Sequence, residues 1–376
     1  MTVTLTEAQT NQIETYYTYL HAHGEISMHE AQTTQFVKME LERLGYRTQT
    51  FSDCPGVVAE IGSGKPVVAV RADMDALWQE VGGKLQANHS CGHDAHMSMV
   101  LVVAAILATA KRPAGTVRLL FQPAEETGSG ALAFCDRGVA ADIDYLYGVH
   151  LRPIQETEDG NARPAILHGA CRTIKGAVDG EQSHASRPHL GINAIEVTAS
   201  LIETLGHVHL DPMIPSSIKM TKLHAGTADN IVPGKATFTL DARAQSNAAM
   251  ETLTASVRRI AESVAAAYHA AIALDINEGS PAAAPAEEAV AYMNAAITAV
   301  LGAAHCQHPI HSSGGDDFNH YAVRYPAIKS TMLALGCDLK PGLHHPLMSF
   351  NHAAMSSGAR ILAEAVLRTL AGAAVH

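Results

Sequence analysis

The stretch Val117-Arg-Leu-Leu-Phe121, followed by Gln122-Pro-Ala-Glu125-Glu126-Thr-Gly-Ser-Gly130, decides the fold class. It is a short apolar strand candidate that ends in an acidic, glycine-rich turn. Val67–Val70 and Leu146–Val149 repeat the pattern, and helical segments separate the three runs. Strands that are buried on both faces of a sheet are apolar at nearly every position. The sequence therefore predicts an α/β sheet covered by helices on both faces, with its chemistry in the loops at the strand ends.

Length and charge limit the classes of function. With 376 residues, the chain has room for two domains. The formal net charge of -11 argues against a nucleic-acid partner. The longest apolar run, Met97 to Ala110, is shorter than a membrane span, so we expect a core helix there and no membrane partner.

The cysteines and the first residues bear on location. The first ten residues lack the basic region and the apolar stretch of a secretory signal, which predicts a cytoplasmic protein. The six cysteines are widely scattered, and this spacing favours free thiols over a disulfide framework. The 22 histidines, several of them beside Cys, Asp or Glu, make a metal site the first functional hypothesis.

The pattern of strand and helix candidates along the sequence changes near His168 and again near Ser280. We expect a first domain formed by residues 1–167 and 281–376, and an inserted α+β domain formed by residues 168–280. Within Thr6–Gly45 the apolar spacing predicts two helices, and Gly62-Ser-Gly-Lys-Pro66 resembles a hairpin turn between two strands. The insert has strand candidates at 172–178, 217–224 and 236–242 and helices at 192–205 and 248–270; a strand at 328–335 and a helix at 353–370 finish the first domain.

The densest group of chemically active residues is His89-Ser-Cys91-Gly-His93-Asp94-Ala-His96, just before the apolar helix. Cys91 and His93 can face one point from a turn, whereas residues two apart on a regular helix diverge. The alternative is an ordinary helix start in which Asp94 complements the helix dipole.

Further candidate ligands follow other strands. The adjacent acids Glu125 and Glu126 could divide metal binding and general-base work, or could form a solvated acidic turn. His150, His344 and the acids of Arg71-Ala-Asp73-Met-Asp75-Ala-Leu77 extend the set. Each group alone is weak evidence, but five such groups in one α/β chain favour a metal centre.

These motifs carry a resemblance to a known family. Arg-Ala-Asp-Met-Asp-Ala-Leu, Cys-Gly-His-Asp-Ala-His, Phe-Gln-Pro-Ala-Glu-Glu, Gly-Val-His-Leu-Arg-Pro, Ser-His-Ala-Ser-Arg-Pro and Leu-His-His-Pro occur in the same order as in the M20 metallopeptidase family. The chain is most similar to the amidohydrolase branch of that family, which contains aminoacylases, hippurate hydrolases and auxin-conjugate hydrolases. The resemblance implies a mixed-sheet catalytic domain with an inserted α+β lid and dimerisation domain.

The resemblance also implies roles in the catalytic domain. It implies two divalent metal ions, zinc or manganese with cobalt as a further option, bridged by Cys91. Glu125 resembles the general base, and Asp75 resembles the acid that orients a ligand imidazole. The implied metal ligands are Cys91, His93, Glu126, His150 and His344.

In the inserted domain, His184 resembles the histidine that stabilises the developing oxyanion, either within one chain or across a dimer interface. Asn230 and Arg243 resemble residues that hold the substrate carboxylate, although Arg243 could equally form a surface ion pair. Two positions depart from the family pattern. Trp78, the only tryptophan, replaces a proline and lies either in the substrate cleft or in the core, and Gly315-Asp-Asp-Phe318 replaces Ser-Glu-Asp-Phe.

The resulting expectation is a metal-dependent amidohydrolase that cleaves small N-acyl amino acids or related conjugates and forms a homodimer. Three alternatives stay open. They are a dipeptidase on the same scaffold, a hydrolase with Cys91 as nucleophile and His93 as its partner, and a non-catalytic binding protein with a degenerate site.

Overall fold

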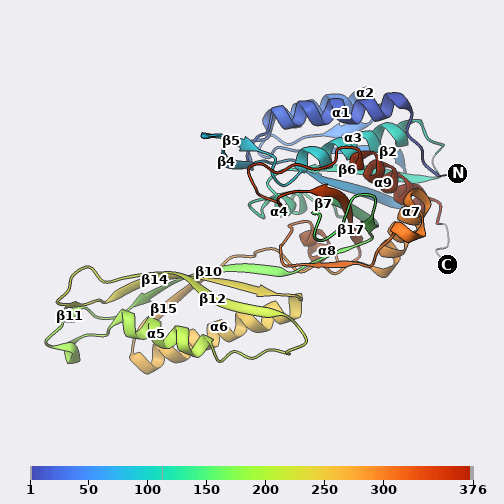
Figure 1. The fold of residues 1–376 in the computed structure, drawn as a ribbon. Helices are drawn as coiled ribbons and strands as arrows, with labels where there is room; N and C mark the ends of the chain where they lie inside the picture. Colours follow the sequence, from blue (N-terminus) through green and yellow to red (C-terminus); the bar gives the residue numbers. More distant parts are fainter. Residues whose placement is uncertain (1, 112, 373–376) are drawn as a thin grey trace. The chain divides into compact units, whose positions relative to one another are not determined.

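The computed structural model describes residues 2–111 and 113–372, and it divides the chain into two compact units (Figure 1). Unit 1 extends to Leu167 and also contains Ala284–His311 and the chain from Asp316 onward. Unit 2 contains His168–Ala283 and the short segment Ser312–Gly315. Each unit has its own hydrophobic core.

Unit 1 is built on a seven-stranded mixed sheet in the order β1-β2-β6-β3-β7-β17-β8. The four central strands β6, β3, β7 and β17 are parallel, while β1, β2 and β8 run antiparallel to their neighbours. The strands are β1 (Arg47–Gln49), β2 (Val57–Ser63), β3 (Val67–Asp73), β6 (Gly115–Gln122), β7 (Tyr145–Pro153), β8 (Ala162–Arg163) and β17 (Lys329–Leu339). The mixed α/β class expected from the sequence is confirmed.

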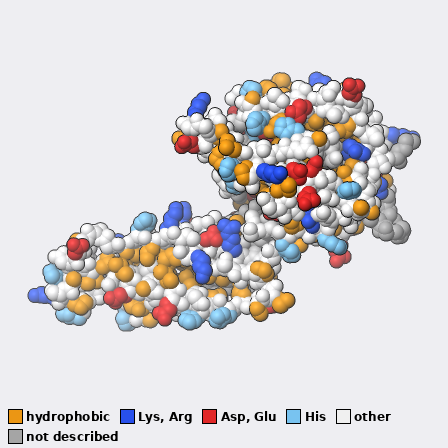
Figure 2. Space-filling model, in the orientation of Figure 1, with side chains coloured by type: hydrophobic (Ala, Val, Ile, Leu, Met, Phe, Trp, Pro, Cys, Tyr) orange, Lys and Arg blue, Asp and Glu red, His pale blue; other side chains and the backbone are white. Residues whose placement is uncertain are grey.

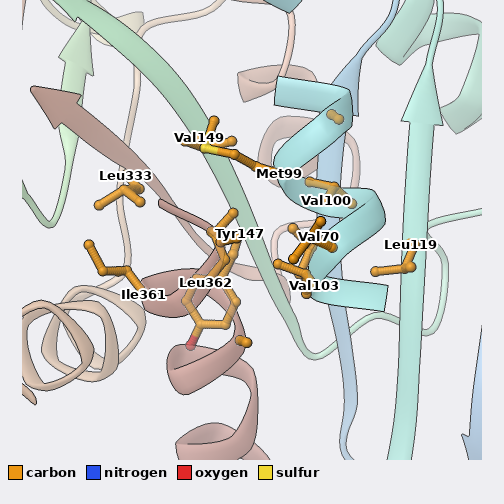
Figure 3. Packing of buried hydrophobic residues seen from close by; sticks show 14 of the residues in the cluster. Val70, Met99, Val100, Val103, Leu119, Tyr147, Val149, Leu333, Ile361 and Leu362 are labelled. Atoms are coloured by element: carbon orange, nitrogen blue, oxygen red, sulfur yellow. The ribbon is translucent and has the colours of Figure 1, made fainter. Parts of the chain in front are cut away.

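Helices cover both faces of this sheet, because alternate residues of its strands feed two different cores. On β3, Val68 and Val70 join the core beneath α1, α3, α7 and α9, whereas Val67 and Ala69 join the core beneath α4 and α8. Figure 3 shows α3 packed against β3, β6 and β7 in the first core. The helices are α1 (Glu7–Ala22), α2 (Ala31–Arg43), α3 (His93–Thr109), α4 (Gly130–Asp136), α7 (Glu287–Leu301), α8 (Asn319–Arg324) and α9 (Ala354–Leu370).

The hairpin expected around Gly62–Pro66 is wrong. The two strands that this turn joins do not pair with each other, because β6 lies between them and pairs with both. The true hairpin of unit 1 comes next in the chain, as β4 (Leu77–Val81) and β5 (Lys84–Asn88). It projects from unit 1 (Figure 1).

Unit 2 is a four-stranded antiparallel sheet, ordered β12-β14-β10-β15, covered on one face by two helices. The strands are β10 (Ala170–Asp179), β12 (Ser216–Ala225), β14 (Lys235–Ala244) and β15 (Ala271–Ile276), and the helices are α5 (Ala194–Leu205) and α6 (Asn247–Tyr268). Two short strands, β11 (Ser183–His184) and β13 (Ile231–Val232), pair beyond the ends of β10 and β14. A separate pair is formed by β9 (Ile166–His168) and β16 (Ile310–Ser312).

The apolar run that starts at Met97 forms most of α3, and nearly all of its residues as far as Leu107 are buried in the core of unit 1, as expected. Over the described part of the chain, no helix combines the length and the apolar character needed to cross a membrane.

Candidate functional site

Parallel strands place the predicted site residues at one edge of the unit 1 sheet. Asp73 and Gln122 end β3 and β6, and His150 lies near the end of β7. Because β6, β3 and β7 are parallel neighbours, their carboxyl ends meet at the same edge. The residues that follow these ends therefore converge.

A tight turn adds two more side chains from the start of α3. Gly92 has a φ of 87°, a left-handed conformation that glycine adopts without strain, and a Cβ there would lie 3.0 Å from Leu151. The turn leaves Cys91 and His93 facing the same point. The Sγ of Cys91 lies 3.6 Å from Nε2 of His150, and one potential ligand atom each from Cys91, His93 and His150 lie within 4.8 Å of one another.

A second group shares the same thiol. Potential ligand atoms of Cys91, Glu126 and His344 also lie within 4.8 Å of one another. Nε2 of His344 is 3.4 Å from Oε2 of Glu126. All five predicted ligands are thus brought together, in two groups that have Cys91 in common.

Two buried atoms at this point lack partners. Nε2 of His93 and Oε1 of Glu126 are buried without a hydrogen bond, and they lie 3.9 Å apart. Unpaired buried polar atoms are costly. A divalent cation would satisfy both atoms, and thiolate, imidazole and carboxylate are a donor set that suits zinc and related ions. The residues present therefore fit a metal centre.

Asp75 connects the ligand histidine to the acidic pair. Its carboxylate accepts the backbone N–H groups of Glu125 and Glu126 at 3.1 and 3.0 Å and the hydroxyl of Ser27 at 2.6 Å. Its backbone carbonyl accepts Nδ1–H of His93 at 2.8 Å, which leaves Nε2 directed to the candidate metal position. Burial opposes ionisation of the Asp75 carboxyl group, but Nδ1 of His93 also lies 3.3 Å from its Oδ1, and this side-chain interaction lowers the pKa of Asp75 below its usual value. One side chain thus fixes His93 and the Glu125–Glu126 turn together.

Glu125 lies among other carboxylates. Burial, together with the nearby charges of Asp316 and Asp317, raises the pKa of Glu125 well above its ordinary value. Its Oε2 is 3.9 Å from Nε2 of His93. A carboxyl group whose proton affinity is raised in this way is better suited to accept a proton than an ordinary glutamate.

The pKa values of Cys91 and His150 are shifted in opposite directions. Burial and the charge of Glu126 raise the pKa of Cys91 well above that of a free thiol. Burial and the neighbouring His96 lower the pKa of His150, so its imidazole is neutral. A neutral imidazole can ligate a metal, and a bound cation would favour the Cys91 thiolate.

Unit 2 holds the remaining predicted polar residues, and all three are exposed. His184 on β11 pairs with Ile231 on β13, and the N–H of Ala185 donates to the carbonyl of Asn230 at 2.9 Å. His184 and Asn230 are therefore neighbours on one short ribbon. Nδ1 of His184 accepts from the backbone N–H and hydroxyl of Ser186 at 3.1 and 2.8 Å, so Nε2 is left to carry the proton and donate.

Arg243 lies at the other end of β14. It pairs with Cys171 near the start of β10, whereas the β11–β13 ribbon continues from the far end of the same two strands (Figure 1). At ~3.3 Å per residue, the separation along the strands is on the order of 30 Å. The guanidinium makes an ion pair with Asp241 at 2.9 Å and donates to the carbonyl of Ser313 at 3.2 Å. The surface ion pair considered as an alternative is present.

Trp78 is not a core residue. Its side chain is 60% exposed on the β4–β5 hairpin, where Leu85 lies diagonally across on the same face and is 59% exposed. Figure 2 shows hydrophobic and charged side chains together on this projection. An indole at that position is available to a ligand.

Comparison with known proteins identifies the family. Residues 69–368 match the model of peptidase family M20/M25/M40. The chain belongs to this family. It is therefore a hydrolase that acts on amide bonds, and the resemblance drawn from the motifs is confirmed.

Named relatives of this M20 hydrolase include three enzymes. The N-acetylcysteine deacetylase of Bacillus subtilis is 27% identical over 92% of this chain and 93% of its own length. Thermostable carboxypeptidase 1 of Saccharolobus solfataricus is 32% identical over 67% of this chain and 68% of its own length. An IAA-amino acid hydrolase of Arabidopsis thaliana is 30% identical over 58% of this chain and 53% of its own length.

Solved structures share the fold of the M20 hydrolase. A Bacillus subtilis protein described as a dinuclear metal-binding peptidase of family M20 superposes with a TM-score of 0.83 at 24% identity, over 97% of this chain and 99% of that chain. An aminobenzoyl-glutamate utilization protein from Klebsiella pneumoniae gives a TM-score of 0.74 at 23% identity, over 96% of both chains. The likeness extends over nearly the whole chain.

A buried ion-pair network next to the M20 site was not predicted. The guanidinium of Arg71 donates to Asp73 at 2.6 Å, to Asp317 at 2.7 Å and to Gln122 at 3.0 Å. His96 has both ring nitrogens engaged, with Nδ1 donating to Asp73 at 2.7 Å and Nε2 accepting from the backbone of Leu151 at 3.0 Å. These residues support the site but leave no free atom on His96 for a metal. The alternation of Arg71 and Asp73 on one strand face was the available signal.

Two more supporting residues lie outside the part that matches the family model. Ser27 donates to Asp75, and Glu30 accepts the backbone N–H of Ala124 at 2.8 Å through a fully buried carboxyl group. Ala124 has a φ of 55°, so this hydrogen bond stabilises a left-handed residue just before Glu125. No motif in the sequence marks either residue.

Proposed function

We propose that this M20 hydrolase cleaves the amide bond of N-acyl amino acids or related small conjugates, with water as the nucleophile. The observation that carries the proposal is the pair of ligand groups sharing Cys91, with Glu125 directly beside them. The deacetylase and the amino acid conjugate hydrolase among the relatives support the same substrate class.

In this proposal two divalent ions, zinc or manganese with cobalt as a further option, are held by five residues. Cys91 is common to both groups, so its thiolate would be the ligand that the two ions share. When bound, the ions lower the pKa of water and polarise the substrate carbonyl. The proposed ligands are Cys91, His93, Glu126, His150 and His344.

Glu125 moves the proton. Its carboxylate takes a proton from the attacking water and delivers it to the leaving nitrogen, for which its raised pKa suits it. Asp75 keeps Glu125 in place through the backbone and orients His93 through its carbonyl.

Arg243 and Asn230 hold the substrate carboxylate in this proposal, His184 donates a hydrogen bond to the developing oxyanion, and Trp78 contacts the acyl group. A small substrate cannot touch both Arg243 and His184 of one chain, because they lie at opposite ends of β14. Asn230 adjoins His184 on the β11–β13 ribbon, so it is equally distant from Arg243 of its own chain. We therefore propose that His184 and Asn230 both act across a homodimer.

Unit 2 offers the surface for such a dimer and serves as the lid and dimerisation domain, while unit 1 is the catalytic domain. Strand β12 is the exposed edge of its sheet, and Ile195 and Ile202 of α5 are exposed beside it. An exposed sheet edge with apolar neighbours is a natural pairing surface. A cytoplasmic location accords with the six cysteines, all of which are free thiols.

A peptidase acting on small peptides is the second candidate, favoured by the carboxypeptidase among the relatives. The test of both candidates is amino-acid release from N-acetyl, N-benzoyl and longer N-acyl amino acids and from dipeptides, with chelator and with added zinc, manganese or cobalt. We expect metal-dependent release from acyl amino acids. Release only from dipeptides would select the second candidate. Activity that survives chelation would favour the Cys91 nucleophile instead, and no release with any metal would favour a non-catalytic binding protein.

A further inference from the structure

His344 differs from the other candidate ligands in how it is supported. Cys91 and His93 flank the start of a buried helix, and His150 lies in a buried strand. His344 lies in the loop between β17 and α9, its side chain is 54% exposed, and its φ is 64°. A left-handed histidine is strained unless its surroundings hold it.

Both backbone polar groups of His344 are held. Its N–H donates to the carbonyl of Ser90 at 2.8 Å, and its carbonyl accepts from Nε2 of Gln79 at 2.9 Å. Ser90 is the residue before Cys91. The N–H of His344 is therefore tied to the segment that carries the shared thiol, and its carbonyl is tied to β4.

Gln79 closes this arrangement into a ring. Its Oε1 accepts from the hydroxyl of Ser90 at 2.8 Å and from Nδ2 of Asn88 at 3.0 Å. The same Asn88 nitrogen donates to the carbonyl of Pro346 at 3.1 Å. The amide side chain of Gln79 on β4 thus connects Ser90, Asn88 on the neighbouring strand β5 and the His344 loop.

We propose that Gln79 is a positioning residue for metal binding, which keeps His344 at the Cys91–Glu126 position so that the second ion can be bound. The inference rests on the proposed role of His344 as a metal ligand. Gln79 is not one of the proposed ligands, and its side chain bonds to the backbone of His344, the hydroxyl of Ser90 and the amide of Asn88.

The test is Gln79→Met, which keeps the length of the side chain and removes its donor and acceptor. Mn²⁺ binding to the metal-free full-length protein is measured by calorimetry, with thermal unfolding of the metal-free protein recorded alongside. We expect one of the two ions to bind about 10- to 100-fold more weakly, the range found when a residue that orients a ligand is lost. Binding of the other ion should stay as in the wild type.

Gln86→Met is the matched control. Gln86 lies directly opposite Gln79 in the same hairpin, so both variants make the same change at paired positions. We expect Gln86→Met to bind both ions normally. Equal weakening in the two variants would mean that the hairpin as a whole is needed, and it would overturn the specific role of Gln79.

His344→Ala separates this inference from the proposed function. If His344→Ala weakens one ion and Gln79→Met weakens neither, the positioning role is wrong while the ligand assignment stands. If the wild type binds fewer than two ions, or if His344→Ala leaves metal binding unchanged, the proposed two-ion centre itself is wrong. Weakening of the same ion in both variants supports the proposal.

Discussion

The candidate residues of the two units are supported very differently. In unit 1, His93 is fully buried and hydrogen-bonded to Asp75, which also holds the backbone of the acidic pair. In unit 2, His184 and Asn230 are exposed on a two-residue ribbon, and Arg243 is engaged with Asp241. Unit 1 is organised for chemistry before a substrate arrives. The proposed contribution of unit 2 requires a partner.

This difference teaches that one chain can contain a buried, hydrogen-bonded candidate metal centre and an exposed set of candidate substrate contacts. Buried networks have few alternative arrangements, because each unpaired polar group is costly. Exposed side chains can adopt several conformations until a ligand or a second subunit fixes one of them. Four variants test the contrast, in order of the expected loss of turnover.

Glu125→Gln should give the largest loss. The amide cannot carry the proton, so we expect kcat to fall by about 10²- to 10⁴-fold with an unchanged metal content. Turnover of an N-acyl amino acid and metal analysis of the purified variant measure the two quantities. Glu287→Gln, an exposed position at the start of α7, is the matched control and should be fully active. Unchanged turnover in Glu125→Gln would remove Glu125 from the role of base.

His184→Ala should give the next largest loss, about 10²- to 10³-fold in kcat, because a donor to the oxyanion is removed. Mixing it with Glu125→Gln and allowing subunits to exchange distinguishes two geometries. If His184 acts across a dimer, one site of each mixed dimer is intact, and about a quarter of wild-type activity returns.

If His184 acts within its own chain, the mixture of variants stays inactive. His189→Ala, another exposed histidine of the same segment, serves as the matched control and should behave as the wild type. A monomeric protein in sedimentation experiments would also contradict the dimer.

Asp75→Asn should reduce turnover less than His184→Ala does, and the reduction should be seen mainly when the metal concentration is low. The amide has one acceptor oxygen in place of the two that accept the N–H groups of Glu125 and Glu126, and it removes the negative charge 3.3 Å from Nδ1 of His93. The backbone hydrogen bond from His93 to residue 75 stays in place. We expect metal affinity to fall by about 10- to 100-fold. Excess Mn²⁺ should restore much of the activity. Normal metal affinity in this variant would show that the Glu125–Glu126 turn keeps its conformation without the Asp75 carboxylate.

Glu30→Gln should affect stability rather than turnover. Burial raises the pKa of Glu30 from 4.5 to about 7, so the folded protein holds a proton that the unfolded chain releases between these values. Stability contributed by this group is therefore lost as pH rises from 4.5 towards 7. At ~1.4 kcal/mol per pKa unit, ionisation at pH ~8 costs about 3 kcal/mol.

The Glu30→Gln variant keeps an acceptor for Ala124 and avoids this cost. Its free energy of unfolding, from urea denaturation, should exceed that of the wild type at pH ~8 and converge with it near pH ~4.5. Glu42→Gln, at an exposed position of α2, makes the same change outside the core and is the matched control. A constant difference for Glu30→Gln would contradict the raised pKa.

Most of the sheet could be predicted from the sequence, because its central strands are buried on both faces and read as continuous apolar runs. Val67–Asp73 is buried at every position. Pairing was less predictable. The Gly62–Pro66 turn looks like a hairpin locally, but β6 inserts between the two strands, and no local signal reports such an insertion.

The residues of the candidate site also differ in whether the sequence could predict them. Cys91, His93 and Glu126 stand in compact motifs, so their proximity follows from strand order and a turn. Glu30 and Gln79 act through backbone groups of distant residues, and such contacts depend on the folded chain rather than on a side-chain pattern. Their roles needed the structure.

The β4–β5 hairpin has a further consequence for how substrate preference could diverge. Its side chains alternate, so Trp78 and Leu85 face outward while Gln79 faces the His344 loop. Substitutions on the outer face leave the inner contacts untouched and cost little folding energy, because they bury nothing. Under the proposed contact of Trp78 with the acyl group, a library varied only at Trp78 and Leu85 should change acyl preference while leaving Gln79 and the His344 loop unchanged.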